Sequence, residues 1–300
     1  MAKRRDIVVG VIIAVTFIMA VGFFGLMFIS LLTGEGDLDF AGFGGNVGLV
    51  EMFGAITETS GRTVIKQIDN FADNKSIKAI IVHINSPGGE VAISQEVYSA
   101  INRAREKKPV VAAMASVAAS GGYYIACAAD RIVANPGTLT GSIGVIFQFH
   151  TFQKLMDKLG IGTETVKSGE FKDVGSYSRS MTKKEELMLR AVIMDAYQQF
   201  VQAVSEGRGM EIDDIYPLAD GSIFTGQQAY SHGLVDTLGG LQDAIDLAAE
   251  LAEIEGKPKI VRYPKRKQWR FFDLLTQLLD NLNGSVTDEL TGPQLMYLYQ

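Results

Sequence analysis

The chain has 300 residues, a formal net charge of −6 at pH 7 and a hydrophobic fraction of 47%, which is enough for a large folded core. A net acidic protein is repelled by nucleic acid and by anionic lipid, so we expect neither as a partner. The single cysteine, Cys127, excludes an intrachain disulfide. The three histidines lie in no close cluster of metal-ligand residues, so we expect no metal and no cofactor.

An apolar, uncharged run at residues 7–32 follows the basic residues Lys3, Arg4 and Arg5. A helix over this run would be roughly 39 Å long at about 1.5 Å per residue, whereas a bilayer core is about 30 Å thick. The run is longer than the apolar region of a cleaved signal peptide, which is the competing interpretation, and it has no clear cleavage site. We therefore expect an uncleaved transmembrane helix over 7–32.

The charges that flank this run predict its orientation. Basic flanks stay on the cytoplasmic side, so residues 1–6 are expected inside the cell. The chain would then be a single-pass protein of the cytoplasmic (inner) membrane, anchored by its N-terminal helix, with a periplasmic or extracellular body. Residues 33–45, rich in glycine and aspartate, are expected to form the linker between them.

The remaining sequence alternates short apolar runs with helical stretches. This alternation predicts an α/β body over residues 46–257 with a mainly parallel sheet. Residues 258–300 are expected to form a C-terminal extension, whose apolar run at 295–299 favours a fraying tail over a segment that enters the site as a self-substrate. Strands are expected at 46–56, 78–85, 110–115, 131–134 and 163–167, and helices at 63–73, 90–107, 121–129, 152–159, 182–206, 227–233 and 241–254.

Ser120 lies between a predicted strand and a predicted helix, in the run AASGGYY at 118–124. A serine in this position is most often the N-cap of the helix. It could instead be a nucleophile, because the free N–H groups at a helix start stabilise a developing oxyanion. The following Gly121 and Gly122 would let a peptide substrate approach the backbone closely.

A second glycine turn, NSPGG at 85–89, follows the buried strand predicted at 78–85. It is typical of an ordinary Pro-Gly turn, and it could also supply a second backbone N–H to an oxyanion hole. Sites in parallel α/β sheets gather at the carboxyl ends of strands, so this turn and Ser120 are candidates for one site.

A serine nucleophile needs a base, and the histidines are poor candidates. His83 is expected inside a buried strand, and no motif surrounds His150 or His232. No G-x-S-x-G run surrounds Ser120 either, which disfavours a hydrolase-type Ser-His-Asp triad.

A lysine can replace histidine when burial lowers its pKa far below the usual value of about 10.4. Two lysines follow the strand predicted at 163–167, in the run VKSGEFKD at 166–173. They are Lys167 and Lys172, and the residues alone do not choose between them.

Five runs of the chain resemble, in order, the motifs of signal peptide peptidase A of the shorter, single-domain type. This family consists of serine proteases of the Clp protease and crotonase superfamily, and the resemblance covers about residues 46–250. It implies a Clp protease/crotonase-like fold with a mainly parallel sheet. The five runs are NSPGG at 85–89, AASGGYY at 118–124, TGSIGV at 140–145, SGEFKD at 168–173, and FTG at 224–226 with GLVD at 233–236.

The resemblance implies a role for each matching residue. Ser120 would be the nucleophile and Lys172 its general base, in a Ser-Lys dyad. The backbone N–H groups of Gly89 and Gly121 would form the oxyanion hole. Two supporting positions, able to hydrogen-bond the lysine amine, would be Ser142 and Ser168.

The resemblance also implies a function and partners. The chain would be a serine endopeptidase that degrades released signal peptides in or near the membrane, and it would form a homo-oligomer. One rival is another membrane-bound protease of the Clp class that acts on membrane-protein partners. A more distant rival is a crotonase-fold acyl-CoA enzyme or a non-catalytic scaffold.

Overall fold

In the computed structural model, the described residues are 15–19, 21–25, 45–263 and 296–298. The chain divides into two compact units, residues 1–41 and 42–300. The elements of the second unit are β1 (Val47–Phe53), α2 (Glu58–Asp73), β2 (Ala79–Ser86), β3 (Gly88–Glu90), α3 (Val91–Arg105), β4 (Val110–Ala119), α4 (Gly121–Ala126), β5 (Arg131–Ala134), β6 (Leu139–Gly141), α5 (Gln153–Leu159), α6 (Lys183–Arg208), α7 (Ile212–Ile215), the 3-10 helix η1 (Tyr216–Leu218), β7 (Ile223–Thr225), α8 (Gly226–Ser231), β8 (Thr237–Leu238), α9 (Leu241–Leu251), β9 (Ile260–Arg262) and β10 (Met296–Leu298).

The transmembrane helix predicted over residues 7–32 is contradicted by the structure. No helix within the described ranges is both long and apolar enough to span a bilayer, which takes about 20 residues. Of the run at 7–32, the structure describes only two short helical stretches, at 15–19 and 21–25. The rest of that run lies outside the described residues, as do the predicted N-terminal tail and all of the predicted linker except residue 45. The same finding contradicts the predicted location as a single-pass protein of the cytoplasmic membrane.

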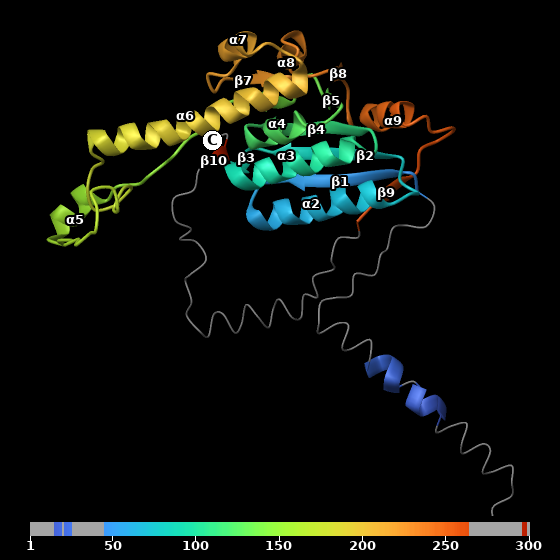
Figure 1. Cartoon of the computed structure of the whole chain (residues 1–300), viewed down its shortest axis with the longest axis horizontal. Helices are drawn as coiled ribbons and strands as arrows, with labels where there is room; N and C mark the ends of the chain where they lie inside the picture. The colour runs from blue at the N-terminus through green and yellow to red at the C-terminus, as the bar shows by residue number, and fades with distance from the viewer. Residues whose placement is uncertain (1–14, 20, 26–44, 264–295, 299–300) are drawn as a thin grey trace, which may run out of the picture. The chain divides into compact units, whose positions relative to one another are not determined.

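A mainly parallel sheet of eight strands forms the centre of the second unit (Figure 1). Its strand order is β7-β6-β4-β2-β1-β9, and β5 pairs with both β4 and β8. Among the described pairs of this sheet, only β6 and β7 run antiparallel. The predicted α/β class with a mainly parallel sheet is confirmed.

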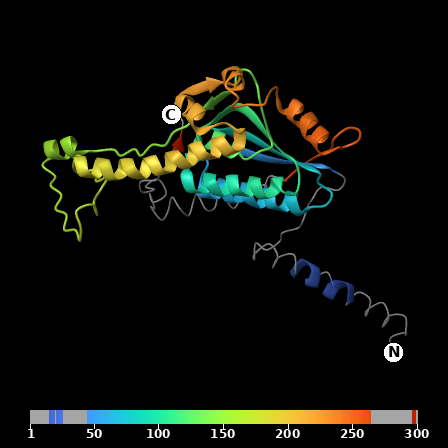
Figure 2. The same ribbon diagram turned by 45° about the horizontal axis from the view of Figure 1, so that its top comes forward.

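Helices cover both faces of the sheet (Figures 1 and 2). Side chains alternate between faces along a strand, so β2 divides its apolar residues between two cores. Ile80, Val82 and Ile84 pack into the larger core with α2, α3, α4 and the C-terminal half of α6. Ala79 and Ile81 face the smaller core, which α9 covers. Burial on both faces explains why the strand has no polar alternation over 79–82.

Side-chain caps set the starts of three described helices, α2, α6 and α8. The predicted Thr182–Glu185 capping box at the start of α6 is confirmed. A second capping box, Thr57–Ser60, starts α2 five residues earlier than the helix predicted at 63–73. The helix start was missed because Ser60 replaces the usual Glu or Gln of that motif.

One long excursion leaves the body between β6 and the core-facing part of α6. We call residues 146–195 the arm; Figures 1 and 2 show that α5 and the N-terminal half of α6 extend beyond the sheet. The strand predicted at 163–167 is wrong. That segment is exposed and has no strand pairing, and Val166 is fully exposed, because no neighbouring strand reaches it.

The C-terminal region returns to the body at two places. β9 pairs with β1, so the sheet continues past residue 257, where the sequence predicted the body to end. β10 pairs antiparallel with β3, with Tyr297 opposite Gly89. Residues 296–298 are therefore an ordered strand instead of the frayed tail that the sequence favoured.

We expect Phe200→Ala to lower the free energy of unfolding by about 3–5 kcal/mol. Phe200 is fully buried and its ring packs edge-on against Tyr124, with centroids 5.1 Å apart, so truncation leaves a cavity between α6 and α4. The matched control is Gln198→Ala on the exposed side of α6, which should change stability by under about 0.5 kcal/mol. Urea unfolding followed by circular dichroism measures both, and equal effects would contradict the packing described.

Candidate active site

Ser120 occupies the tight connection between β4 and α4. Its backbone has φ 53° and ψ −118°, a conformation that is rare for a residue with a side chain. The residue is 1% exposed, and its Oγ has no hydrogen-bond partner among the described residues. It stands at the N-cap position of α4, but its side chain makes no capping bond. Capping therefore does not account for this serine.

The turn before β3 holds Gly89 in a fixed orientation. Ser86 Oγ accepts a hydrogen bond from the N–H of Gly88 at 3.1 Å. Ile56 donates its N–H to the carbonyl of Gly88 and accepts one from the N–H of Glu90. Backbone groups alternate sides along an extended strand, so the N–H of Gly89 points to the opposite edge. A Cβ at Gly89 would lie 2.0 Å from the Ile56 carbonyl oxygen, so glycine is required there.

Strand register brings this turn close to Ser120. Ser86 of β2 pairs with Ala118 of β4, two residues before Ser120. The contact is close, because a Cβ at Gly122 would lie 2.8 Å from the Ser86 carbonyl oxygen. The first amide groups of α4, beginning with Gly121, have no partner within the helix.

Ser142 lies on the other side of Ser120, directly after β6. The N–H of Ser120 donates to the carbonyl of Gly141 at 2.8 Å, so the residue after Gly141 is a neighbour of the nucleophile. Ser142 is 8% exposed, has φ 50°, and donates its N–H to Ser222 at 2.7 Å. The structure thus places Ser120, Gly89, Gly121 and Ser142 at the carboxyl edge of the sheet.

Lys172 and Ser168 lie elsewhere, in exposed turns of the arm. The Lys172 amide donates to the carbonyl of Gly169 at 3.2 Å, and no described residue bonds the Lys172 side-chain amine. The amine of its rival Lys167 is engaged. It donates to Asp173 Oδ1 at 2.5 Å and to the Glu170 carbonyl at 2.9 Å.

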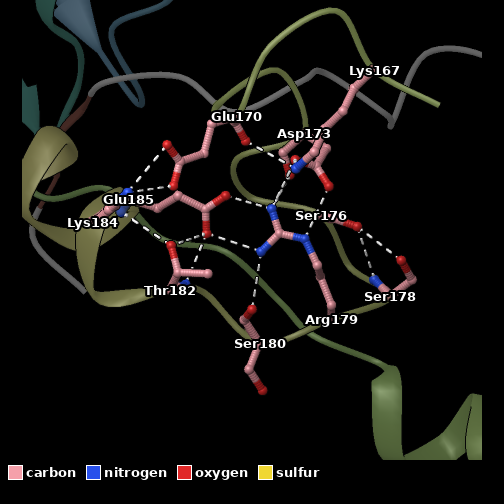
Figure 3. A network of polar contacts seen from close by, with 10 residues as sticks. All are labelled: Lys167, Glu170, Asp173, Ser176, Ser178, Arg179, Ser180, Thr182, Lys184 and Glu185. Atoms are coloured by element: carbon pink, nitrogen blue, oxygen red, sulfur yellow. Dashed lines mark hydrogen bonds and ion pairs between the residues drawn. The ribbon is translucent and has the colours of Figure 1, made fainter. Parts of the chain in front are cut away.

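A network of charges surrounds the Lys172 turn (Figure 3). The guanidinium of Arg179 bonds both Asp173 and the buried carboxylate of Glu185. Its hydrogen bonds, with a smaller contribution from Lys167, hold the pKa of Asp173 well below its usual range. Arg179 likewise lowers the pKa of Glu185 to about 2, assisted by the backbone of Thr182. These carboxylates are therefore charged throughout the neutral range.

The sequence did not single out Arg179. One signal was present: Asp173 and Glu185 stand six residues before and six residues after it, and both bond it. A cation centred between two carboxylates could have been predicted to bridge them.

The two groups of candidate residues are separated within one copy of the chain. Glu185 lies near the start of α6, and Ala196 is the first residue of this helix in the core. Those eleven steps along an α-helix span about 16 Å. The structure does not join Ser120 Oγ to Lys172, whose turn is exposed on the arm, so the Ser-Lys dyad stays a prediction.

None of the three histidines bonds Ser120 Oγ. His83 packs its ring edge-on against Phe53, with centroids 5.1 Å apart, and burial lowers its pKa. His232 contacts the ring of Phe224, and His150 is exposed. A histidine base is disfavoured on this geometry, as the sequence indicated.

Comparison with known proteins identifies the family of the chain. The model of "Peptidase family S49" matches residues 102–255, and that of "Clp protease" matches residues 46–137. The chain is 42% identical to "Putative protease slr0021" of Synechocystis sp., over 69% of this chain and 74% of the relative. It is 39% identical to "Serine protease SPPA, chloroplastic" of Arabidopsis thaliana, over 66% of this chain and 29% of the relative.

A third relative is "Putative signal peptide peptidase SppA" of Enterococcus faecium, which is 39% identical over 61% of this chain and 53% of the relative. The S49 match covers about half of the chain and includes both turns that were assigned to the dyad. The Clp match covers the first glycine turn and the Ser120 connection. The chain therefore belongs to peptidase family S49 and is a serine protease of the signal peptide peptidase A type.

Proposed function

We propose that the chain cleaves peptide bonds with Ser120 as nucleophile and Lys172 as general base. The observation that carries the proposal is the Ser120 hydroxyl, which is buried, without a partner, and held in a strained backbone beside two glycine turns. Residues in sparsely populated backbone conformations persist where the surrounding structure enforces them, and they cluster at active sites.

The reaction follows from these positions. Ser120 Oγ forms a bond to the carbonyl carbon of the substrate and passes its proton to the neutral amine of Lys172. The N–H groups of Gly89 and Gly121 stabilise the oxyanion. The protonated lysine then gives its proton to the leaving amine as the peptide bond breaks. Water, activated by Lys172, hydrolyses the acyl-enzyme and regenerates the Ser120 hydroxyl.

The structure favours Lys172 over Lys167 as the base. A base must offer a free lone pair, and an ammonium has donors only. The Lys167 amine forms an ion pair with Asp173 and also donates to a backbone carbonyl, so it is bound as a cation. The Lys172 amine has no such partner among the described residues. Ser142 and Ser168 could hydrogen-bond the lysine once it reaches Ser120.

The edge of β3 supports an extended peptide as substrate. β10 of this chain lies antiparallel along Gly88–Glu90, in the arrangement by which an extended peptide adds to a strand edge. Ser142 is one of the residues that line a pocket of about 750 Å³. Most of the lining is apolar, including Ile143, Val145 and Ile193, and Arg190 and Asp220 are its charged members. Short apolar peptides, such as released signal peptides, fit this edge and pocket.

We further propose that the enzyme is a homo-oligomer in which the arm of one copy brings Lys172 to Ser120 of another. Two features support this arrangement: Ser120 Oγ has no partner in one copy, and the arm projects from the body. Apolar side chains exposed along the arm would be buried in such a contact. They include Phe152, Leu155, Leu159, Ile161, Val166, Phe171 and Tyr177.

We expect Ser120→Ala and Lys172→Ala each to lower kcat by about 10⁴-fold or more, because each removes one member of a group that acts as a unit. Lys167→Ala is the comparison, and its loss should stay within about tenfold. Cleavage of a fluorogenic apolar peptide measures all three, with circular dichroism as the control for folding. A Lys172→Ala enzyme as active as wild type would refute the base assignment.

Gly89→Ala should lower kcat by about 10²–10³-fold, since the added Cβ displaces the turn that aims one oxyanion donor. Gly137→Ala is the matched control, because a Cβ there meets nothing within 4 Å. The same peptide assay compares the two variants. If Gly89→Ala kept the wild-type kcat, the Gly89 N–H would not be an oxyanion donor.

Mixing the two inactive variants tests the arrangement between copies. If Lys172 acts on Ser120 of a neighbour, mixed oligomers of Ser120→Ala and Lys172→Ala contain intact pairs, in roughly a quarter of the sites at equal amounts. Activity should therefore return after co-expression or subunit exchange. Oligomers that are shown to be mixed but stay inactive would place both members of the dyad in one copy.

A further inference from the structure

We infer that Arg179 is a positioning residue for the reaction: it fixes the Lys172 turn to the start of α6. The inference rests on the proposed role of Lys172 and adds a residue that the reaction does not touch. It comes from the bonding of one guanidinium, which reaches both the turn and the helix (Figure 3).

Arg179 holds the turn at its carboxyl side. Arg179 Nε donates to Asp173 Oδ2 at 2.9 Å, and Nη2 donates to the Asp173 carbonyl at 3.3 Å. Asp173 directly follows Lys172, so these bonds fix the backbone that carries the amine. Lys167 holds the other carboxylate oxygen of Asp173 at 2.5 Å, which limits rotation of the carboxylate.

The same guanidinium is anchored on α6. Arg179 Nη1 donates to Glu185 Oε2 at 2.9 Å, and Nη2 donates to Glu185 Oε1. The Glu185 side chain is only 2% exposed, and its Oε2 also accepts the N–H of Thr182 at 2.8 Å as part of the capping box. The anchor is therefore tied to the first turn of a long helix.

Few other contacts hold Lys172 in place. Its amine bonds no described residue. Its turn is otherwise held by local backbone bonds, such as that from Lys172 to Gly169 at 3.2 Å, and by an exposed ion pair at 3.0 Å between Glu170 and Lys184 of α6. The turn is exposed on the arm, away from the cores. Without Arg179 the described residues would link the turn to α6 only through that exposed ion pair, and exposed ion pairs contribute little. Displacement of a catalytic group by about 1 Å can lower a rate by about 10²-fold.

The planar fork of arginine is needed for this link. Five N–H donors in a fixed plane can bond two carboxylates at once, whereas a lysine ammonium is a single point charge on a flexible stem. Arg179 uses Nε, Nη1 and Nη2 in this way, and Nη1 also donates to the Ser180 carbonyl at 3.1 Å.

The test measures kcat and KM of Arg179→Met with the apolar peptide, using the full chain in its native oligomer. We expect kcat to fall by about 10²-fold, with KM little changed, because the amine is misplaced while the peptide edge at β3 is intact. Arg179→Lys should recover only part of the loss. The matched control is Arg62→Met, which removes a guanidinium that also bonds two carboxylates, Glu58 and Glu96, and it should keep the wild-type kcat.

A double-mutant cycle separates positioning from general damage to the fold. Asp173→Asn leaves the contact between Arg179 and Glu185, so it should fold even if Arg179→Met does not, and it should also lower kcat. If Arg179 acts through Asp173, the double variant should lose no more kcat than the worse single variant. The inference would be overturned if the kcat loss of the double variant equalled the product of the two single losses. It would also be overturned by a wild-type kcat in folded Arg179→Met or in Asp173→Asn.

Lys172→Ala, measured in the same assay, distinguishes a failure of the proposed base from a failure of the positioning role of Arg179. If Lys172→Ala is inactive and Arg179→Met is fully active, only the positioning role fails. If Lys172→Ala is active, the proposed base fails and the positioning role fails with it.

Discussion

The backbone of Ser120 is held in a conformation that an L-residue rarely adopts, and the body of the site depends on it. Such a conformation disfavours the folded state by about 1–3 kcal/mol. The Ser120 N–H is fixed to the Gly141 carbonyl and its own carbonyl to the Tyr124 N–H. β4 is in turn held between β2 and β6. The packed sheet thus enforces the strain and keeps the hydroxyl from capping α4.

The chain divides the proposed chemistry between a packed region and a projecting one. Ser120, the proposed nucleophile, and the glycine turns lie where parallel strands end, and register between strands fixes them. The turn of Lys172, the proposed base, instead lies on a segment outside both cores, where Arg179 bonds the neighbouring Asp173. Apolar packing positions Ser120 and the glycine turns, whereas electrostatic bonds position the turn of Lys172.

Much of the fold could be predicted from the sequence. The buried strands and the capped start of α6 carried strong local signals, because continuous β-branched runs and a Thr182–Glu185 pair have few alternatives. The strand predicted at 163–167 failed, since β propensity needs a neighbouring strand to pair with, and a sequence does not say that none is present. The pairing of β10 with β3 joins residues some two hundred positions apart, which no local pattern encodes.

The candidate site was only partly predictable for the same reason. Ser120 and the Gly89 turn follow strands, so their meeting could be inferred from the topology of a parallel sheet. Lys172 came from resemblance alone, because the residues did not choose between it and Lys167, and in a single copy it is exposed on the arm. Arg179 was missed although carboxylates stand six residues before and after it, because that spacing belongs to no regular element and is only a weak sign of contact.

The unbroken run of α6 has a mechanical consequence. One end of this helix is rooted in the core at Phe200, and the other carries the carboxylate that grips Arg179. When a rigid helix tilts about the end that is packed in the core, its other end moves by a distance proportional to the length of the helix. Small shifts in the packing of α6 against α4 therefore become larger displacements at Lys172. A substitution in the core can in this way lower the rate of the proposed reaction without touching any reacting atom.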